Sequence, residues 1–173
     1  MASCIIVIPC YNEAERLDTS KFLTYLSHSP DVSLLFVNDG SRDETIEVLR
    51  RMQDGTQQVQ VLDKQQNGGK GEAVREGMLH ALSQSGVHFV GFWDADLATP
   101  LEAIGDLLEV LLSQIEVALV FGSRVKLLGR DIDRRAFRHS LEAVCLRPAP
   151  LWSWTCLSMT RSAGQNFFAR LLT

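Results

Sequence analysis

Five short runs of apolar residues recur along the chain, each separated from the next by a stretch with helical periodicity. The runs lie at residues 3–9, 33–38, 59–63, 88–93 and 117–122. Continuous apolar runs are typical of strands that are covered on both faces. Helices are expected between them at residues 14–28, 42–54, 69–85 and 100–113, the last with Thr99 as N-cap and Pro100 in its first turn. This alternation predicts an α/β fold, with a doubly wound, mainly parallel sheet and helices on both faces.

Composition narrows the class of protein. A chain of 173 residues with 46% hydrophobic and 22% charged residues suits one soluble domain. Its net charge of −4 argues against general nucleic-acid binding, which needs a basic surface. Basic residues nevertheless crowd between Arg124 and Arg138. This cluster is either a solvated helix face or a patch for anions or a membrane surface.

The cysteines and the first residues indicate the compartment. The sequence has four cysteines without C-x-x-C spacing, namely Cys4, Cys10, Cys145 and Cys156. We therefore expect free thiols in a reducing environment. The first apolar run is too short for a signal peptide or a membrane span and has no basic flank. A cytoplasmic protein is the expectation.

Each predicted strand is followed by polar residues that a core would not need. The segments are PCYNEAE, NDGSRDET, QQNGGKGEAVREGM, DADLATP and GSRV, in chain order. Ligands of doubly wound sheets bind beyond the carboxyl ends of the strands. The sequence therefore predicts a site along one edge of the sheet.

The DAD segment at the end of the fourth run is the strongest single signal. In extended chain, residues i and i+2 project to the same side, so Asp94 and Asp96 would converge. Two such carboxylates repel each other unless a cation lies between them. Mg²⁺ or Mn²⁺ prefers oxygen ligands and completes its shell with water and substrate phosphates. An acidic helix N-terminus is the alternative, and it explains Asp96 better than Asp94.

Three other loops each allow two interpretations. NDGSRD is a plain turn, or Asp39 accepts hydrogen bonds from a base or ribose. In NGGKGEAVREG, Lys70 is a solvated lysine or a partner of a substrate diphosphate, although the segment is neither a P-loop nor a Rossmann fingerprint. Arg124 forms a surface salt bridge or contacts phosphate with both arms of its guanidinium.

Together, IPCYNE, VNDGSRDET, NGGKGEAVREGM, DADLATP and GSR resemble the family 2 glycosyltransferases with the GT-A fold, in the family's order. The chain is most similar to the branch of dolichyl-phosphate β-glucosyltransferases and polyprenyl-phosphate hexosyltransferases, over residues 4 to about 139. The resemblance implies an inverting transfer from a nucleotide sugar of the UDP-glucose or GDP-mannose type. It implies a nucleotide pocket of Pro9, Tyr11, Glu13, Asp39, Lys70, Gly71 and Asp94. It also implies a metal held by Asp94 and Asp96, with Arg124 facing the transferring centre.

The resemblance further implies a polyprenyl (dolichyl-type) phosphate as acceptor. The oxygen of such a phosphate is already anionic at pH 7, because the second phosphate pKa is about 6, so no carboxylate base is required. The cluster from Arg124 to Arg138 could bring the two anions together and attract a cytoplasmic membrane face peripherally. Two alternatives remain open: a truncated GT-A domain that binds nucleotide sugar without transfer, and an oxidoreductase on a Rossmann sheet, which the first strand disfavours because it lacks G-x-G-x-x-G.

The resemblance implies a nucleotide-sugar-binding domain at residues 1–139, and we expect residues 140–173 to be an atypical tail after it. The tail lacks the DTQCGAK-like motif expected from the resemblance. One choice of codons for residues 152–169, regrouped one nucleotide earlier, encodes Asp-Thr-Gln-Cys-Gly-Ala-Lys. Trp154-Thr155 and Met159-Thr160 each give aspartate in that frame for every codon choice. We therefore hypothesise a frameshift near residues 139–143, with an unusual natural segment as the alternative.

Overall fold

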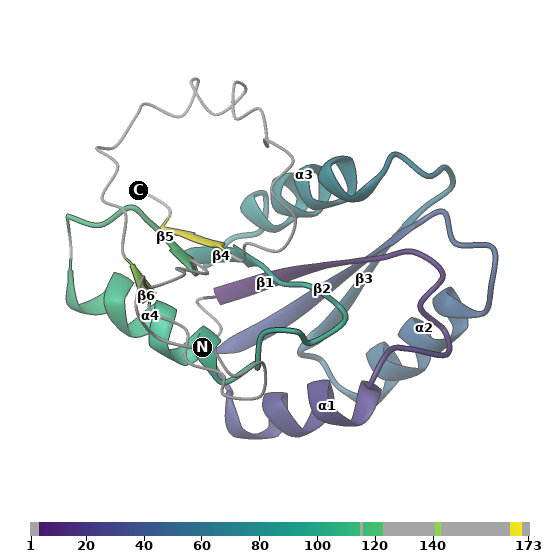
Figure 1. The fold of residues 1–173 in the computed structure, drawn as a ribbon, viewed down its shortest axis with the longest axis horizontal. Coiled ribbons are helices and arrows are strands. Elements are labelled where there is room, and N and C mark those ends of the chain that lie inside the picture. The colour runs from purple at the N-terminus through teal and green to yellow at the C-terminus, as the bar shows by residue number, and fades with distance from the viewer. Residues whose placement is uncertain (1–3, 115, 123–140, 143–166, 171–173) are drawn as a thin grey trace, which may run out of the picture.

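The computed structural model describes residues 4–114, 116–122, 141–142 and 167–170 (Figure 1). Strands of these residues form one sheet in the order β3-β2-β1-β4-β7-β5-β6. They are β1 (Cys4–Cys10), β2 (Val32–Asp39), β3 (Val59–Lys64), β4 (Phe89–Phe92), β5 (Leu119–Gly122), β6 (Leu141–Glu142) and β7 (Phe167–Arg170). The pairs β3–β2, β2–β1 and β1–β4 are parallel. This confirms the predicted α/β fold with a mainly parallel sheet.

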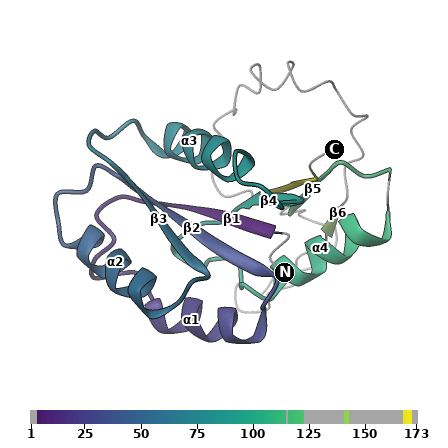
Figure 2. The same cartoon turned by 180° about the vertical axis from the view of Figure 1, so that it is seen from behind.

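Helices cover both faces of the sheet, as Figures 1 and 2 show from opposite sides. They are α1 (Thr19–His28), α2 (Thr45–Gly55), α3 (Lys70–Leu82) and α4 (Ala103–Ser113). Alternate residues of β1 enter different cores. Ile6 and Ile8 belong to the cluster with α1, α2 and α4, whereas Ile5 and Val7 belong to the cluster with α3. Burial on both faces explains why the strands read as continuous apolar runs.

Helix α3 lies unusually close to the sheet. A Cβ atom on Gly77 would lie 2.5 Å from Cγ1 of Val7 and 2.8 Å from Cγ2 of Val37. Only a residue without a side chain allows this approach. The first turn of α3 is therefore held near the carboxyl ends of the neighbouring strands, where the polar loops lie.

The helices begin later than the sequence predicts, with delays of three residues or more for α1, α2 and α4. Helix α1 begins at Thr19 rather than at residue 14, and the Asp18 side chain caps it by accepting a hydrogen bond from the Lys21 N–H at 3.2 Å. Helix α4 begins at Ala103 with Glu102 as its N-cap, so the expected Thr99 cap is wrong. The Thr99 carbonyl instead accepts a hydrogen bond from the Trp93 indole at 3.0 Å, which ties the preceding loop to the core.

Strand β7 was not predicted. It is antiparallel to both β4 and β5 and separates them. Its residues belong to the segment 140–173, so part of the predicted tail contributes backbone to the sheet. The boundary at residue 139 and the frameshift stay predictions. None of the helices within the described ranges combines the length and the apolar character that crossing a bilayer requires.

Candidate functional site

The loops that follow the parallel strands gather at one edge of the sheet (Figure 1). Strands β1, β2, β3 and β4 end at Cys10, Asp39, Lys64 and Phe92. Their carboxyl ends point the same way because the strands are parallel. The segments 11–18, 40–44, 65–69 and 93–102 therefore form one rim, as expected from the fold.

The first two loops are joined by hydrogen bonds between backbone and side chains. The Asn12 N–H donates to Oγ of Ser41 at 3.0 Å, and the Arg42 N–H donates to Oδ1 of Asn12 at 2.9 Å. The Glu13 N–H donates to Oγ1 of Thr45 at 2.8 Å. Asn12 adopts a φ of 53°, a left-handed conformation that asparagine tolerates better than most residues. The polar residues of NDGSRD thus shape the loop.

Asp43 completes this junction. Its Oδ2 accepts a hydrogen bond from the Ala14 N–H at 3.2 Å, and its Oδ1 accepts hydrogen bonds from the N–H and hydroxyl of Thr45. Desolvation raises the pKa of the Asp43 carboxyl, but these donors outweigh it and the net pKa is lowered. Asp43 therefore holds the first loop as an ionised carboxylate.

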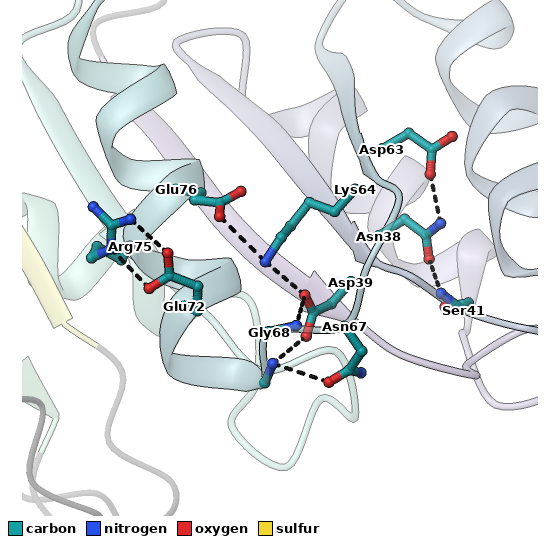
Figure 3. Close-up of polar contacts among 11 residues, drawn as sticks. Asn38, Asp39, Ser41, Asp63, Lys64, Asn67, Gly68, Glu72, Arg75 and Glu76 are labelled. Atoms are coloured by element: carbon teal, nitrogen blue, oxygen red, sulfur yellow. Dashed lines mark hydrogen bonds and ion pairs between the residues drawn. The ribbon is translucent and has the colours of Figure 1, made fainter.

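Asp39 is buried, and both of its oxygens are engaged (Figure 3). Oδ1 accepts a hydrogen bond from the Gly68 N–H at 3.0 Å, and Oδ2 accepts one from the Gly69 N–H at 2.8 Å. Oδ1 also lies 2.7 Å from Nζ of Lys64, whose side chain is only 10% exposed. Asp39 thus anchors the glycine-rich loop, and a contact with a base or ribose stays a prediction.

Lys64 is a site residue that the sequence reading missed. Its ammonium lies between Asp39 and Glu76, which is 3.5 Å away (Figure 3). Burial alone would lower the pKa of Lys64, but the hydrogen bond and charge of Asp39, followed by Glu76, raise it overall. Lys64 is also the register partner of Asp39 across β2 and β3. Aligning the ends of the two predicted strands could have found this pair.

Gly40 allows the second loop to meet the glycine-rich loop. It has a φ of 65°, and a Cβ on it would lie 2.7 Å from the backbone nitrogen of Asn67. Both facts exclude larger residues. The two loops therefore meet backbone to backbone beside Asp39.

The DAD segment does not adopt the extended conformation that we expected. Ala95 and Asp96 lie in a turn, closed by a hydrogen bond from the Ala98 N–H to Oδ1 of Asp96 at 3.0 Å. Leu97 has a φ of 53° and packs against the core. The alternation argument for convergence therefore does not apply. Asp94 and Asp96 nevertheless share one loop on the rim, the first half-buried and the second exposed.

Lys70 pairs with Asp94. Its Nζ contacts Oδ1 of Asp94 and lies 5.2 Å from the centroid of the Phe92 ring. Lys70 is the first residue of α3, so this ion pair joins the glycine-rich loop to the DAD loop. The predicted lysine and one predicted carboxylate are thus brought together, with a cation at Asp94.

From one loop of the rim, Asp94 and Asp96 offer oxygen ligands of the kind that Mg²⁺ or Mn²⁺ prefers. Among the described residues there is no group of three or more His, Cys, Asp or Glu side chains suited to a metal. Ions that keep water and substrate phosphate as ligands need only one or two carboxylates. In this structure the positive charge beside Asp94 is the Lys70 ammonium. Asp94 and Asp96 would hold the ion, which would neutralise the charge of a diphosphate.

The remaining predicted residues lie at or near the rim. Pro9 is partly buried near the end of β1, Tyr11 is 42% exposed, and Glu13 forms an ion pair with Arg16 at 2.8 Å. A Cβ on Gly71 would meet open space. Arg124, with the cluster up to Arg138, lies outside the described residues.

The described cysteines are free and buried. Burial raises the pKa of the Cys4 thiol to about 12, and burial together with the charge of Glu13 raises that of Cys10. Such thiols are inert structural groups. This agrees with the free thiols expected for these two positions, while Cys145 and Cys156 lie outside the described residues.

A comparison with protein families decides the lineage. The model for glycosyl transferase family 2 matches residues 5–154. The chain belongs to this family. The match confirms the resemblance drawn from the loop motifs, and it extends beyond residue 139 into the segment where the sequence reading placed the tail.

Curated relatives include dolichyl-phosphate beta-glucosyltransferases. The Drosophila melanogaster enzyme is 34% identical over 79% of this chain and 45% of its own length. The enzyme ALG5C of Trichomonas vaginalis is 32% identical over 72% of this chain and 39% of its own length. The chain thus spans less than half of these relatives.

Solved structures share the GT-A fold. The mannosyltransferase PcManGT from Pyrobaculum calidifontis, in complex with GDP-Man and Mn²⁺, matches with a TM-score of 0.55 at 19% identity, over 68% of this chain and 34% of that chain. Residues 1–349 of S. aureus TarS, in complex with UDP-GlcNAc, match with a TM-score of 0.56 at 18% identity, over 75% of this chain and 36% of that chain. Likeness at this identity concerns the fold alone.

Proposed function

We propose that the chain binds a nucleoside-diphosphate sugar at the rim and transfers its hexose, with inversion, to an acceptor phosphate. The observation that carries this proposal is the pairing of Asp94 with a cation beside the open first turn of α3. A bound Mg²⁺ or Mn²⁺ would stabilise the charge that develops on the diphosphate as it leaves. Membership of glycosyl transferase family 2 supports a nucleotide-sugar donor, and the donor that we propose is of the UDP-glucose or GDP-mannose type.

The transfer requires the protein mainly to position the two substrates and to neutralise their negative charge. An acceptor phosphate oxygen attacks the anomeric carbon as the bond to the diphosphate oxygen breaks, and the nucleoside diphosphate leaves with the electron pair. No proton has to be removed from a phosphate oxygen that is already anionic at pH 7. Lys70 supplies a positive charge next to the departing diphosphate. A polyprenyl phosphate is the proposed acceptor because relatives are dolichyl-phosphate enzymes.

Binding is the first experiment. UDP and GDP should bind the purified chain in the presence of Mn²⁺ by calorimetry, and excess chelator should abolish binding. Asp94→Asn and Asp96→Asn should each weaken Mn²⁺-dependent binding by roughly tenfold or more. Asp54→Asn serves as a control, because Asp54 is exposed in the last turn of α2, at the opposite edge of the sheet. Nucleotide binding that is indifferent to chelator would contradict the proposal.

A turnover assay separates transfer from mere binding. The enzyme should form sugar-phosphate lipid from a UDP- or GDP-hexose and polyprenyl phosphate vesicles. Mn²⁺-dependent binding without product would instead favour the alternative function, a nucleotide-sugar-binding GT-A domain. This alternative is considered because the chain spans less than half the length of these relatives. We expect lipid transfer at the cytoplasmic face of a membrane, where the protein would bind peripherally.

A further inference from the structure

The Lys70–Asp94 ion pair places a resident cation on a carboxylate proposed to bind metal. The Lys70 side chain is 53% exposed, whereas that of Asp94 is only 17% exposed. The ammonium therefore reaches from solvent into a half-buried position. The Phe92 ring, 5.2 Å from Nζ, supports it there through its negative π face.

The backbone of Lys70 is fixed independently of this ion pair. The preceding residue, Gly69, donates its N–H to Asp39 at 2.8 Å, and its carbonyl accepts the Ala73 N–H at 3.0 Å. Asp39 is in turn neutralised by Lys64. Since the backbone is anchored, the Lys70 side chain can exchange partners without moving α3.

Two cations at one carboxylate repel each other. A divalent ion arriving at Asp94 meets the Lys70 ammonium on the same group, so it must displace the ammonium or tolerate the repulsion. A nucleoside diphosphate removes this conflict, because its oxygens can accept both the divalent ion and the ammonium. The competition therefore exists for metal alone and disappears for metal with diphosphate.

We propose that Lys70 is an exchanging counter-ion: it neutralises Asp94 in the free protein and passes to the diphosphate when metal and nucleotide bind together. This inference rests on the proposed function. It makes Lys70 a substrate-binding residue that couples the two ligands. The chain should bind Mn²⁺ weakly by itself and more tightly with UDP or GDP present, with a reciprocal effect on the nucleotide.

The test measures Mn²⁺ binding and nucleotide binding separately, by calorimetry or by the paramagnetic resonance of free Mn²⁺. In Lys70→Met, Mn²⁺ alone should bind roughly two- to fivefold more tightly, the effect of removing a partly exposed ion-pair partner. At saturating Mn²⁺, the nucleotide that the wild type binds should bind roughly tenfold more weakly, because a charged hydrogen bond is lost. These opposite changes reduce the coupling between the ligands.

Lys21→Met is the matched control. Lys21 is a similarly exposed lysine that pairs with Asp18 at 3.0 Å on α1. The Lys21→Met substitution lowers the net charge of the protein by the same amount as Lys70→Met. Because Lys21 pairs with Asp18 and not with Asp94, both affinities should stay at wild-type values. Lys70→Arg keeps the charge and should keep the weak binding of Mn²⁺ alone.

The possible failures can be told apart. If Mn²⁺ alone binds Lys70→Met no more tightly than wild type, the exchange is refuted. The proposed function still stands in that case, provided that the wild type binds nucleotide in a Mn²⁺-dependent way. Equal tightening in Lys21→Met would also refute the exchange, since net charge would then explain the effect. A wild type that binds neither UDP nor GDP with Mn²⁺ would overturn the proposed function and this inference together.

Discussion

Lys64→Met tests whether the glycine-rich loop depends on a buried ion pair. The substitution keeps most of the apolar length of the side chain and removes the ammonium that lies 2.7 Å from Asp39. Asp39 would remain buried, with two backbone N–H donors but no counter-ion. Removing one partner of a buried pair costs about 3 to 5 kcal/mol. We expect about 3 kcal/mol, the low end of this range, because the Lys64 side chain keeps some exposure and because Glu76, at 37% exposure, is solvated when it loses the ammonium.

Urea denaturation at pH 7 measures this loss as a change in the free energy of unfolding. Arg50→Met is a matched control on a neighbouring pair: Arg50 lies 3.3 Å from Asp63, the residue before Lys64, but its side chain is 64% exposed. Such exposed pairs contribute less than about 1 kcal/mol. If Lys64→Met costs no more than Arg50→Met, the argument from burial is wrong.

The same difference should depend on pH. The pKa of Lys64 is raised in the folded protein, so its contribution is complete below the unfolded pKa, about 10.4. It is lost as the pH rises through the folded value. The gap between wild type and Lys64→Met should therefore be constant from pH 7 to 9 and narrow above about pH 10.4. A gap that widens in that range would contradict the assignment.

Three further outcomes are expected. Gly77→Ala should lower the free energy of unfolding by about 1 to 2 kcal/mol in urea denaturation, because its Cβ would overlap valine methyl groups of β1 and β2. Gly105→Ala, with nothing near its Cβ, should raise the free energy of unfolding by about 0.5 to 1 kcal/mol. Cys4 and Cys10 should resist iodoacetamide in the native protein and react after unfolding, as peptide mapping by mass spectrometry would reveal. The nucleotide sequence behind residues 152–169 should encode the DTQCGAK-like motif one nucleotide earlier, and its absence there would end the frameshift hypothesis.

The apolar pattern predicted the central elements because burial on both faces leaves a direct trace in sequence. The strand expected at residues 59–63 runs from Val59 to Lys64, and the helix expected at residues 42–54 runs from Thr45 to Gly55. Boundaries were less accurate where tertiary contacts decide them. Residues 14–18 have helical composition, but the Ala14 N–H donates to Asp43 of the second loop, and the N–H groups of Arg16 and Leu17 close a turn on the Glu13 carbonyl.

The site was predicted in outline and missed in detail. The loop motifs located the rim, but the conformation of the DAD segment depends on a turn closed by Asp96 itself. Asp39 looked available for a ligand because sequence does not reveal that Gly68 and Gly69 donate to it. Strand β7 could not be predicted, since four residues at Phe167–Arg170 carry no periodicity of their own.

The position of β7 has a consequence for how the protein is made. The strand that separates β4 from β5 is synthesised after both of them. Until it arrives, one side of β4, with the apolar sequence FVGF, offers unpaired backbone groups to any passing strand. A nascent chain on the ribosome is thus exposed to mispairing for as long as the later residues are missing, and we expect chaperones to improve its soluble yield.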